Sequence, residues 1–408
     1  MSNFTAEQQA AIETLHCNLL VKAGAGAGKT RVLVERYVRI LAAGVADTDG
    51  IVAITFTRKA AREMKERIRT KVDELLATAD GNEWMRWREV ANRLDTVAIS
   101  TIHSLCSRIL REHPAEAGVD PEFGLMEEAR AKELLDEVWQ STLAQAAEQA
   151  SPWLTRLLAV YSPARVREDL RPLFDKVLSE GLVGPNLEQS LWPVQDRTDE
   201  RRKQADRLKQ ACRELFDLAA AAKRKSGTQE RLQSLREQWP AMEQVIDGAT
   251  ENPDQLDELE AAFRNLRGGD FNETLRERKQ AAEALRGAIL DRAALLLLPD
   301  LCELFRLAGA EWNRVKRACR TLTYDDLETE TERLLLTHPE ICDRYNRRIQ
   351  FLMVDECQDI NERQRSIIYL LAGGDPQRLK GTGLFAVGDV KQSIYRFRGA
   401  DARVFGRV

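Results

Sequence analysis

The chain has 408 residues, of which 43% are hydrophobic and 31% charged, and this length predicts two or three globular domains rather than one core. The formal net charge is −4, so any contact with nucleic acid requires a local basic surface. The seven cysteines include no close pair and no stretch approaches 18 apolar residues, which argues against zinc, iron–sulfur and thioredoxin-like sites and a membrane span, and predicts a cytoplasmic protein.

The first informative segment is a run of small residues that follows the apolar residues 19–21. It ends in Gly-Lys-Thr and precedes a helical pattern of apolar residues at 34, 37, 38 and 41. A strand, a glycine-rich loop and a helix form the context that a phosphate-binding loop requires, although alone the segment could be a glycine-rich turn before a helix. We expect a nucleotide's phosphates to be surrounded by backbone N–H groups of this loop. Its residues are Ala23, Gly24, Ala25, Gly26, Ala27, Gly28, Lys29 and Thr30.

Further along the chain, strand-like runs alternate with helical patterns at both ends of the sequence. Apolar runs lie at 51–54 and 97–99, and they return at 351–354 and 384–387. This alternation predicts a parallel sheet with crossover helices. Long charged helices fill the middle, where residues 205, 208, 212, 215, 219 and 222 form one apolar stripe. We therefore expect an α/β domain made of residues 1–120 and 311–408, interrupted by a large all-helical insertion at 121–310.

Two acidic residues, Asp355 and Glu356, end the strand-like run at 351–354. The carboxyl end of a strand is where a nucleotide-binding sheet places its metal-binding and base groups. One carboxylate can hold Mg²⁺ while the other polarises the attacking water. Acids after an apolar run can also simply begin a helix, but the phosphate loop favours the catalytic interpretation. The histidines at 16, 103, 113 and 338 are scattered, which argues against a hydrolase that relies on metal alone.

The third segment, residues 387–400, combines an amide, aromatic residues and arginines beyond the last strand-like run. Gln392 is a candidate sensor of a terminal phosphate. Tyr395 and Phe397 are candidates for stacking on nucleic acid bases. The same pattern also fits ordinary core aromatics at an amphipathic edge.

The order of these motifs resembles that of the UvrD/Rep-type superfamily 1 DNA helicases. The shared motifs are the phosphate loop, Thr-Phe-Thr-Arg-Lys-Ala-Ala at 55–61, Thr-Ile-His-Ser at 101–104, Asp-Glu-Cys-Gln-Asp at 355–359 and Gly-Asp-Val-Lys-Gln-Ser-Ile-Tyr at 388–395. Residues 100–106, 323–328 and 391–398 look most like the AddA (RecB-like) helicase–nuclease subunits. The resemblance covers about 1–120 and 310–402, and the insertion only by its position and helical character.

The resemblance implies a RecA-like P-loop NTPase lobe that binds ATP and Mg²⁺ and hydrolyses ATP to unwind DNA in the 3′–5′ direction during double-strand break repair. The residues implied as catalytic are Lys29, Asp355, Glu356 and Gln392. Gln8 would recognise the adenine edge, and Arg31 would lie near the phosphates. Thr30 and Asp355 would hold the metal. The single-strand path would be lined by Phe56, Thr57, His103, Tyr395 and Phe397, and Arg58 stands where the family usually has asparagine.

The resemblance also implies partners and missing parts. Members of this group close ATP between two RecA-like lobes, and neither a second lobe nor a nuclease domain follows residue 401 in the sequence. We therefore expect an N-terminal portion of a longer helicase that acts on single-stranded and double-stranded DNA beside an AddB-like subunit. The alternatives are a single-lobe module that binds nucleotide and DNA without turnover, and a P-loop ATPase unrelated to nucleic acid. ATPase stimulation by single-stranded DNA separates the motor from the binding module.

Overall fold

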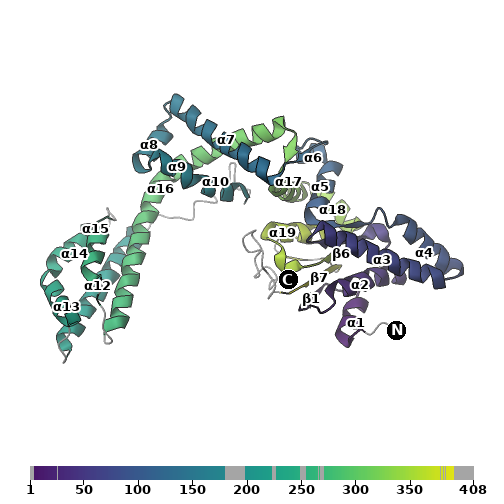
Figure 1. The fold of residues 1–408 in the computed structure, drawn as a ribbon, viewed down its shortest axis with the longest axis horizontal. Coiled ribbons are helices and arrows are strands. Elements are labelled where there is room, and N and C mark those ends of the chain that lie inside the picture. The colour runs from purple at the N-terminus through teal and green to yellow at the C-terminus, as the bar shows by residue number, and fades with distance from the viewer. Residues whose placement is uncertain are drawn as a thin grey trace. The chain divides into compact units, whose positions relative to one another are not determined.

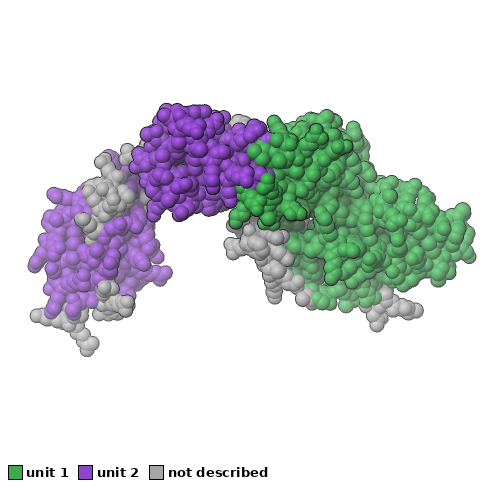
Figure 2. All heavy atoms as spheres, turned by 45° about the horizontal axis from the view of Figure 1, so that its top comes forward, with its two compact units in different colours: residues 1–133, 315–408 green, residues 134–314 purple. Residues whose placement is uncertain are grey.

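A computed structural model of the chain describes residues 4–24, 26–179, 198–222, 227–248, 254–264, 266, 271–376, 378–379, 381 and 383–389. The chain forms two compact units, coloured green and purple in Figure 2. One consists of residues 1–133 with 315–408, and the other of residues 134–314. The expectations for Ala25, Gln392, Tyr395 and Phe397 lie outside the described residues.

A five-stranded parallel sheet organises the first unit (Figure 1). In chain order its strands are β1 (Leu19–Lys22), β2 (Ile51–Thr55), β3 (Ala98–Thr101), β6 (Phe351–Val354) and β7 (Leu384–Gly388). They lie side by side in the order β1-β7-β6-β2-β3, which confirms the expected parallel sheet. Val354 pairs with Ile54 on one side and with Ala386 on the other. The carboxyl ends of the central strands therefore meet at one edge of the sheet.

Both faces of the sheet are covered by helices, because the side chains of each strand alternate between two cores. Ile51 and Ala53 of β2 face one core, whereas Val52 and Ile54 face the other. Helices that contribute to the first core are α1 (Ala6–Glu13), α2 (Lys29–Ala43), α3 (Arg58–Thr78) and α4 (Gly81–Arg93). Helices that contribute to the second are α5 (Ile102–Glu112), α17 (Tyr324–Thr337), α18 (Pro339–Arg348) and α19 (Glu362–Leu371). Short elements complete this unit: η1 (Thr48–Gly50), α6 (Pro114–Ala117), β4 (Gly124–Leu125) paired with β5 (Thr321–Leu322), and η3 (Cys357–Asp359).

The described residues of the second unit form helices and their connecting turns, without a strand. Its helices are α7 (Glu128–Glu148), α8 (Pro152–Val160), α9 (Pro163–Glu168), α10 (Leu170–Ser179), α12 (Thr198–Ala221), α13 (Gly227–Glu237), α14 (Trp239–Gly248), α15 (Asp254–Phe263) and α16 (Asn272–Ala318). The apolar stripe predicted on residues 205–222 packs into a core with α13 to α16. Another cluster stacks Trp139 on Phe174, with centroids 5.3 Å apart, beside Phe305. No described helix combines the length and the apolar character needed to cross a membrane.

Candidate functional site

The predicted phosphate loop joins β1 to α2. Gly26 and Gly28 have φ angles of 74° and 75°, in the left-handed region that favours glycine. Gly28 is the N-cap of α2, so the first turn of that helix opens directly from the loop. The N–H of Ala23 donates to the carbonyl of Gly388 over 3.1 Å, which attaches the loop to β7. The loop therefore presents a helix N-terminus held against the central strands, as anion binding requires.

Helix α1 places Gln8 against this loop. The Gln8 side-chain N–H donates to the carbonyl of Ala27 over 3.0 Å, and its Oε1 accepts from the N–H of Thr5 over 2.9 Å. Arg31, in the first turn of α2, stacks over the ring of Phe4 with its guanidinium carbon 4.3 Å from the ring centroid. Both residues thus lie beside the loop, while adenine recognition by Gln8 and a phosphate contact of Arg31 stay predictions.

The second sequence motif meets the loop through an ion pair. Lys29 Nζ lies 2.7 Å from Glu356 Oε2, and the Lys29 side chain is only 10% exposed. Gln358 donates to the same Glu356 oxygen over 2.8 Å, and its own Oε1 accepts from the N–H of Asp389 over 2.9 Å. The loop, the end of β6 and the end of β7 are therefore linked by polar side chains at one edge of the sheet. Sequence reasoning assigned no role to Gln358.

Asp355 and Glu356 differ in backbone conformation at the end of β6. Asp355 donates its N–H to the carbonyl of Ile54 over 2.9 Å and remains in line with the sheet. Glu356 turns into the left-handed region with a φ of 50°, and its N–H donates to Asp355 Oδ1 over 3.0 Å. Burial, followed by the negative charge of Glu356, raises the pKa of Asp355 to about 6.

The crowding of these acids fits a site for a divalent cation. A cation beside Asp355 would relieve the burial and repulsion that raise its pKa. Carboxylate and hydroxyl oxygens are ligands that Mg²⁺ accepts. Thr30 follows Lys29 in the first turn of α2, so it belongs to the segment that the Lys29–Glu356 contact brings to the acidic residues. The donor set of Thr30 and Asp355 therefore suits Mg²⁺.

A separate cavity of about 550 Å³ is lined in part by residues predicted to contact DNA. Phe56 and His103 line it, together with Tyr324 and the basic side chains of Arg58 and Arg108. Phe56 is 38% exposed, so part of its side chain faces solvent. The cavity thus combines aromatic faces with positive charge, the two features that bind single strands.

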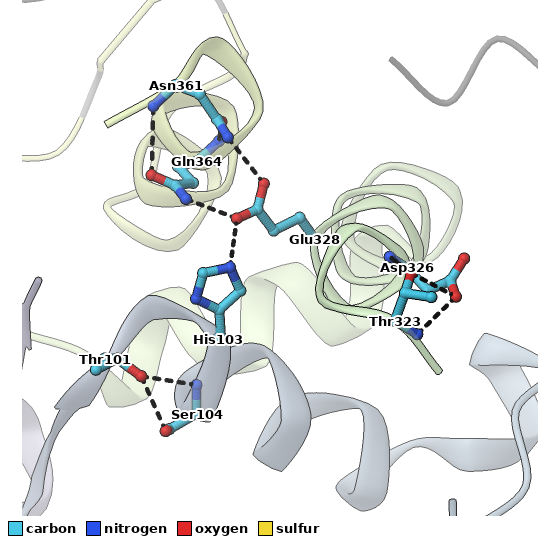
Figure 3. A network of polar contacts seen from close by, with 8 residues as sticks. All are labelled: Thr101, His103, Ser104, Thr323, Asp326, Glu328, Asn361 and Gln364. Atoms are coloured by element: carbon cyan, nitrogen blue, oxygen red, sulfur yellow. Dashed lines mark hydrogen bonds and ion pairs between the residues drawn. The ribbon is translucent and has the colours of Figure 1, made fainter. Parts of the chain in front are cut away.

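Thr57 and His103 are each engaged by protein groups. Thr57 is the N-cap of α3, where its hydroxyl accepts from the N–H of Ala60 over 3.0 Å. His103 Nε2 lies 2.9 Å from Glu328 Oε1, and the His103 ring meets the edge of Tyr324 with centroids 5.1 Å apart. Figure 3 shows His103 pointing at Glu328, the last residue of the 323–328 motif, to which sequence reasoning assigned no role.

The family model of the UvrD/REP helicase N-terminal domain matches residues 4–408. The chain belongs to this family. The match spans the phosphate loop and the acidic motif as well as the helical unit between them. The resemblance carried by the sequence motifs, which lie towards the two ends of the chain, is therefore confirmed.

Three bacterial relatives of this family member are named as subunits of an ATP-dependent helicase/nuclease. The protein of Ligilactobacillus salivarius (strain UCC118) is 29% identical over 98% of the chain, and that of Bacillus pumilus (strain SAFR-032) is 27% identical over 99%. The protein of Staphylococcus aureus (strain JH9) is 26% identical over 95%. The matches cover 36%, 36% and 35% of these relatives, so the chain spans about a third of their length.

Proposed function

We propose that this chain is the ATP-binding lobe of an ATP-dependent DNA helicase of the helicase–nuclease type. The observation that carries the proposal is the ion pair between Lys29 and Glu356, which joins a phosphate loop to the acidic end of β6. The names of the relatives point the same way.

In this proposal, ATP binds with its phosphates at the N-terminus of α2. Lys29 moves from Glu356 to the terminal phosphates, because an ammonium neutralises phosphate charge as well as carboxylate charge. Glu356, held by Gln358, then orients and deprotonates the attacking water. Thr30 and Asp355 hold Mg²⁺, which supplies charge neutralisation on the phosphates. Gln8 recognises the adenine, and Gln392 senses the terminal phosphate.

The proposed DNA contact is the cavity that Phe56, His103 and Tyr324 line. Bases stack on the aromatic side chains, and Arg58 and Arg108 attract the phosphates of the DNA strand. On the resemblance of the motifs alone, we also propose Thr57, Tyr395 and Phe397 as DNA contacts. Because stacking is available to every base, binding of single strands is expected to depend on salt and little on sequence.

The wider role follows the relatives and the sequence motifs. We infer a cytoplasmic protein that moves 3′–5′ along single strands and separates duplex DNA during double-strand break repair and recombination. An AddB-like subunit is the proposed partner. We propose these properties for a whole helicase. This chain spans about a third of the length of the related proteins.

The proposal is tested by measuring phosphate release from ATP with and without a single-stranded oligonucleotide, in a protein that carries this chain and a second RecA-like lobe. Stimulation by the oligonucleotide supports a DNA-dependent motor. Binding of ATP and DNA without any turnover contradicts it and leaves a nucleotide- and DNA-binding module. The Glu356→Gln variant serves as the control for contaminating ATPases, because it keeps the fold of the loop while losing the base.

A further inference from the structure

Glu328 is a buried carboxylate on which donors from two other helices converge. Its side chain is 4% exposed. One oxygen accepts from His103 Nε2 of α5 over 2.9 Å and from the Gln364 amide over 2.6 Å. The other accepts from the Asn361 amide over 3.0 Å. Figure 3 shows these three side chains surrounding Glu328.

This arrangement determines which nitrogen of the His103 ring carries a proton. Burial alone would raise the pKa of Glu328, but the hydrogen bonds from His103, Gln364 and Asn361 together hold that pKa below its ordinary value. An ionised carboxylate only accepts hydrogen bonds, so His103 must carry a proton on Nε2. The other ring nitrogen, Nδ1, is turned away from Glu328, and the ring itself lines the cavity proposed for DNA.

The other two donors connect Glu328 to the acidic end of β6. Asn361 is the N-cap of α19 and Gln364 is its N3 residue, and the two form a reciprocal capping box. Each of their side chains therefore both caps the helix and holds Glu328. Helix α19 follows the short turn η3, whose N-cap is Glu356. Asn361 and Gln364, which support His103 through Glu328, thus lie only a few residues after Glu356, the proposed catalytic base.

We propose that Glu328 is the positioning residue for the DNA cavity: it holds His103 as the Nε2–H tautomer against the strand path and anchors the ring to α19. This inference rests on the proposed function, because it takes a single strand to be the occupant of the cavity. Glu328 itself does not touch the strand. It acts through His103, and both residues must therefore affect DNA binding as one unit.

The test is a double-mutant cycle read by fluorescence anisotropy of a labelled oligothymidine. Glu328→Gln keeps the size of the side chain but replaces the carboxylate that accepts three hydrogen bonds with a neutral amide. We expect this change to weaken oligothymidine binding about 3–10-fold. His103→Ala is expected to weaken it similarly, and the double variant no further than His103→Ala alone. The matched control is Glu330→Gln, on the same helix and paired with Arg333, which is expected to bind like the wild type.

If Glu328→Gln weakens binding by the same factor with and without His103, Glu328 acts independently of the histidine and the inference is overturned.

A measurement on the wild type avoids any folding defect of the variants. In protein labelled with ¹⁵N-histidine, with the His103 signal assigned by its loss in His103→Ala, we expect a proton on Nε2 at neutral pH. A neutral ring protonated only on Nδ1 overturns the inference. A wild type that binds no oligothymidine overturns the proposed function instead, while the tautomer still decides whether Glu328 positions His103.

Discussion

Lys29 and Glu356 lie 327 residues apart in the sequence, yet Lys29 Nζ and Glu356 Oε2 are 2.7 Å apart. The contact arises because β1 and β6 both border β7, so that the loop after β1 and the acids after β6 reach the same edge of the sheet. A partly buried cation at a helix N-terminus and a carboxylate beside it can exchange partners when phosphate enters. We propose that ATP binds at this contact.

The proposed catalytic role of Glu356 predicts that Glu356→Gln binds ATP but loses most hydrolysis. An amide keeps the shape of the side chain but cannot accept a proton from water, and such losses are on the order of 10²–10⁴-fold. Phosphate release in a protein with both lobes measures the effect. Glu340→Gln, at an exposed glutamate in the first turn of α18, is the control and should hydrolyse ATP at the wild-type rate. A Glu356→Gln variant with wild-type turnover would place the base elsewhere.

The proposed stacking role of Phe56 predicts that Phe56→Ala weakens single-strand binding by about 1–3 kcal/mol, without a new sequence preference. The matched control is Trp84→Ala. Trp84 is 45% exposed on α4 and does not line the cavity. Anisotropy titrations at several salt concentrations also count phosphate contacts, since the logarithm of the affinity should fall by about 0.7 per logarithm of salt for each contact. Equal affinities of wild type and Phe56→Ala would place the strand path elsewhere.

The lowered pKa of Glu328 predicts a pH-dependent contribution to stability. In the folded protein the carboxylate stays ionised to lower pH than in the unfolded chain. Its contribution is therefore present above the ordinary pKa of 4.5 and is lost as pH falls below that value. Urea unfolding at pH 7 should show Glu328→Gln destabilised by about 1–3 kcal/mol, with a smaller difference at pH 4. A difference that grows on acidification would contradict this sign.

Much of the first unit could be predicted from the sequence, because its signals are local. The apolar runs at 351–354 and 384–387 became the strands β6 and β7, and the phosphate loop was marked by its glycines and by Lys29. These features depend on periodicity and on backbone geometry within a few residues.

The polar network around Glu328 could not be predicted in this way. It joins α5, α17 and α19, and its members are separated by long stretches of sequence. Glu328 sits among other acids of a charged helix, so nothing in the local pattern marks it as buried. The pairing of His103 with Glu328 depends on how three helices pack on one face of the sheet, and composition and spacing do not encode that packing.

Gln358 was missed for a related reason. Its position two residues after Glu356 was visible, but an amide in an acidic segment has no single expected partner. After the left-handed turn at Glu356, the Gln358 side chain donates back to the Glu356 carboxylate. The hydrogen bond from Gln358 to Glu356 can therefore be predicted only after the backbone conformation of this turn is known.

Binding of ATP at the phosphate loop is tested by the affinity of the wild type and Lys29→Ala for a fluorescent ATP analogue in the presence of Mg²⁺. Removing a charged partner of the phosphates should weaken binding about 10–100-fold, whereas Lys132→Ala, at an exposed lysine of α7, should bind like the wild type. Equal affinities of wild type and Lys29→Ala would contradict the assignment of the ATP site to the phosphate loop.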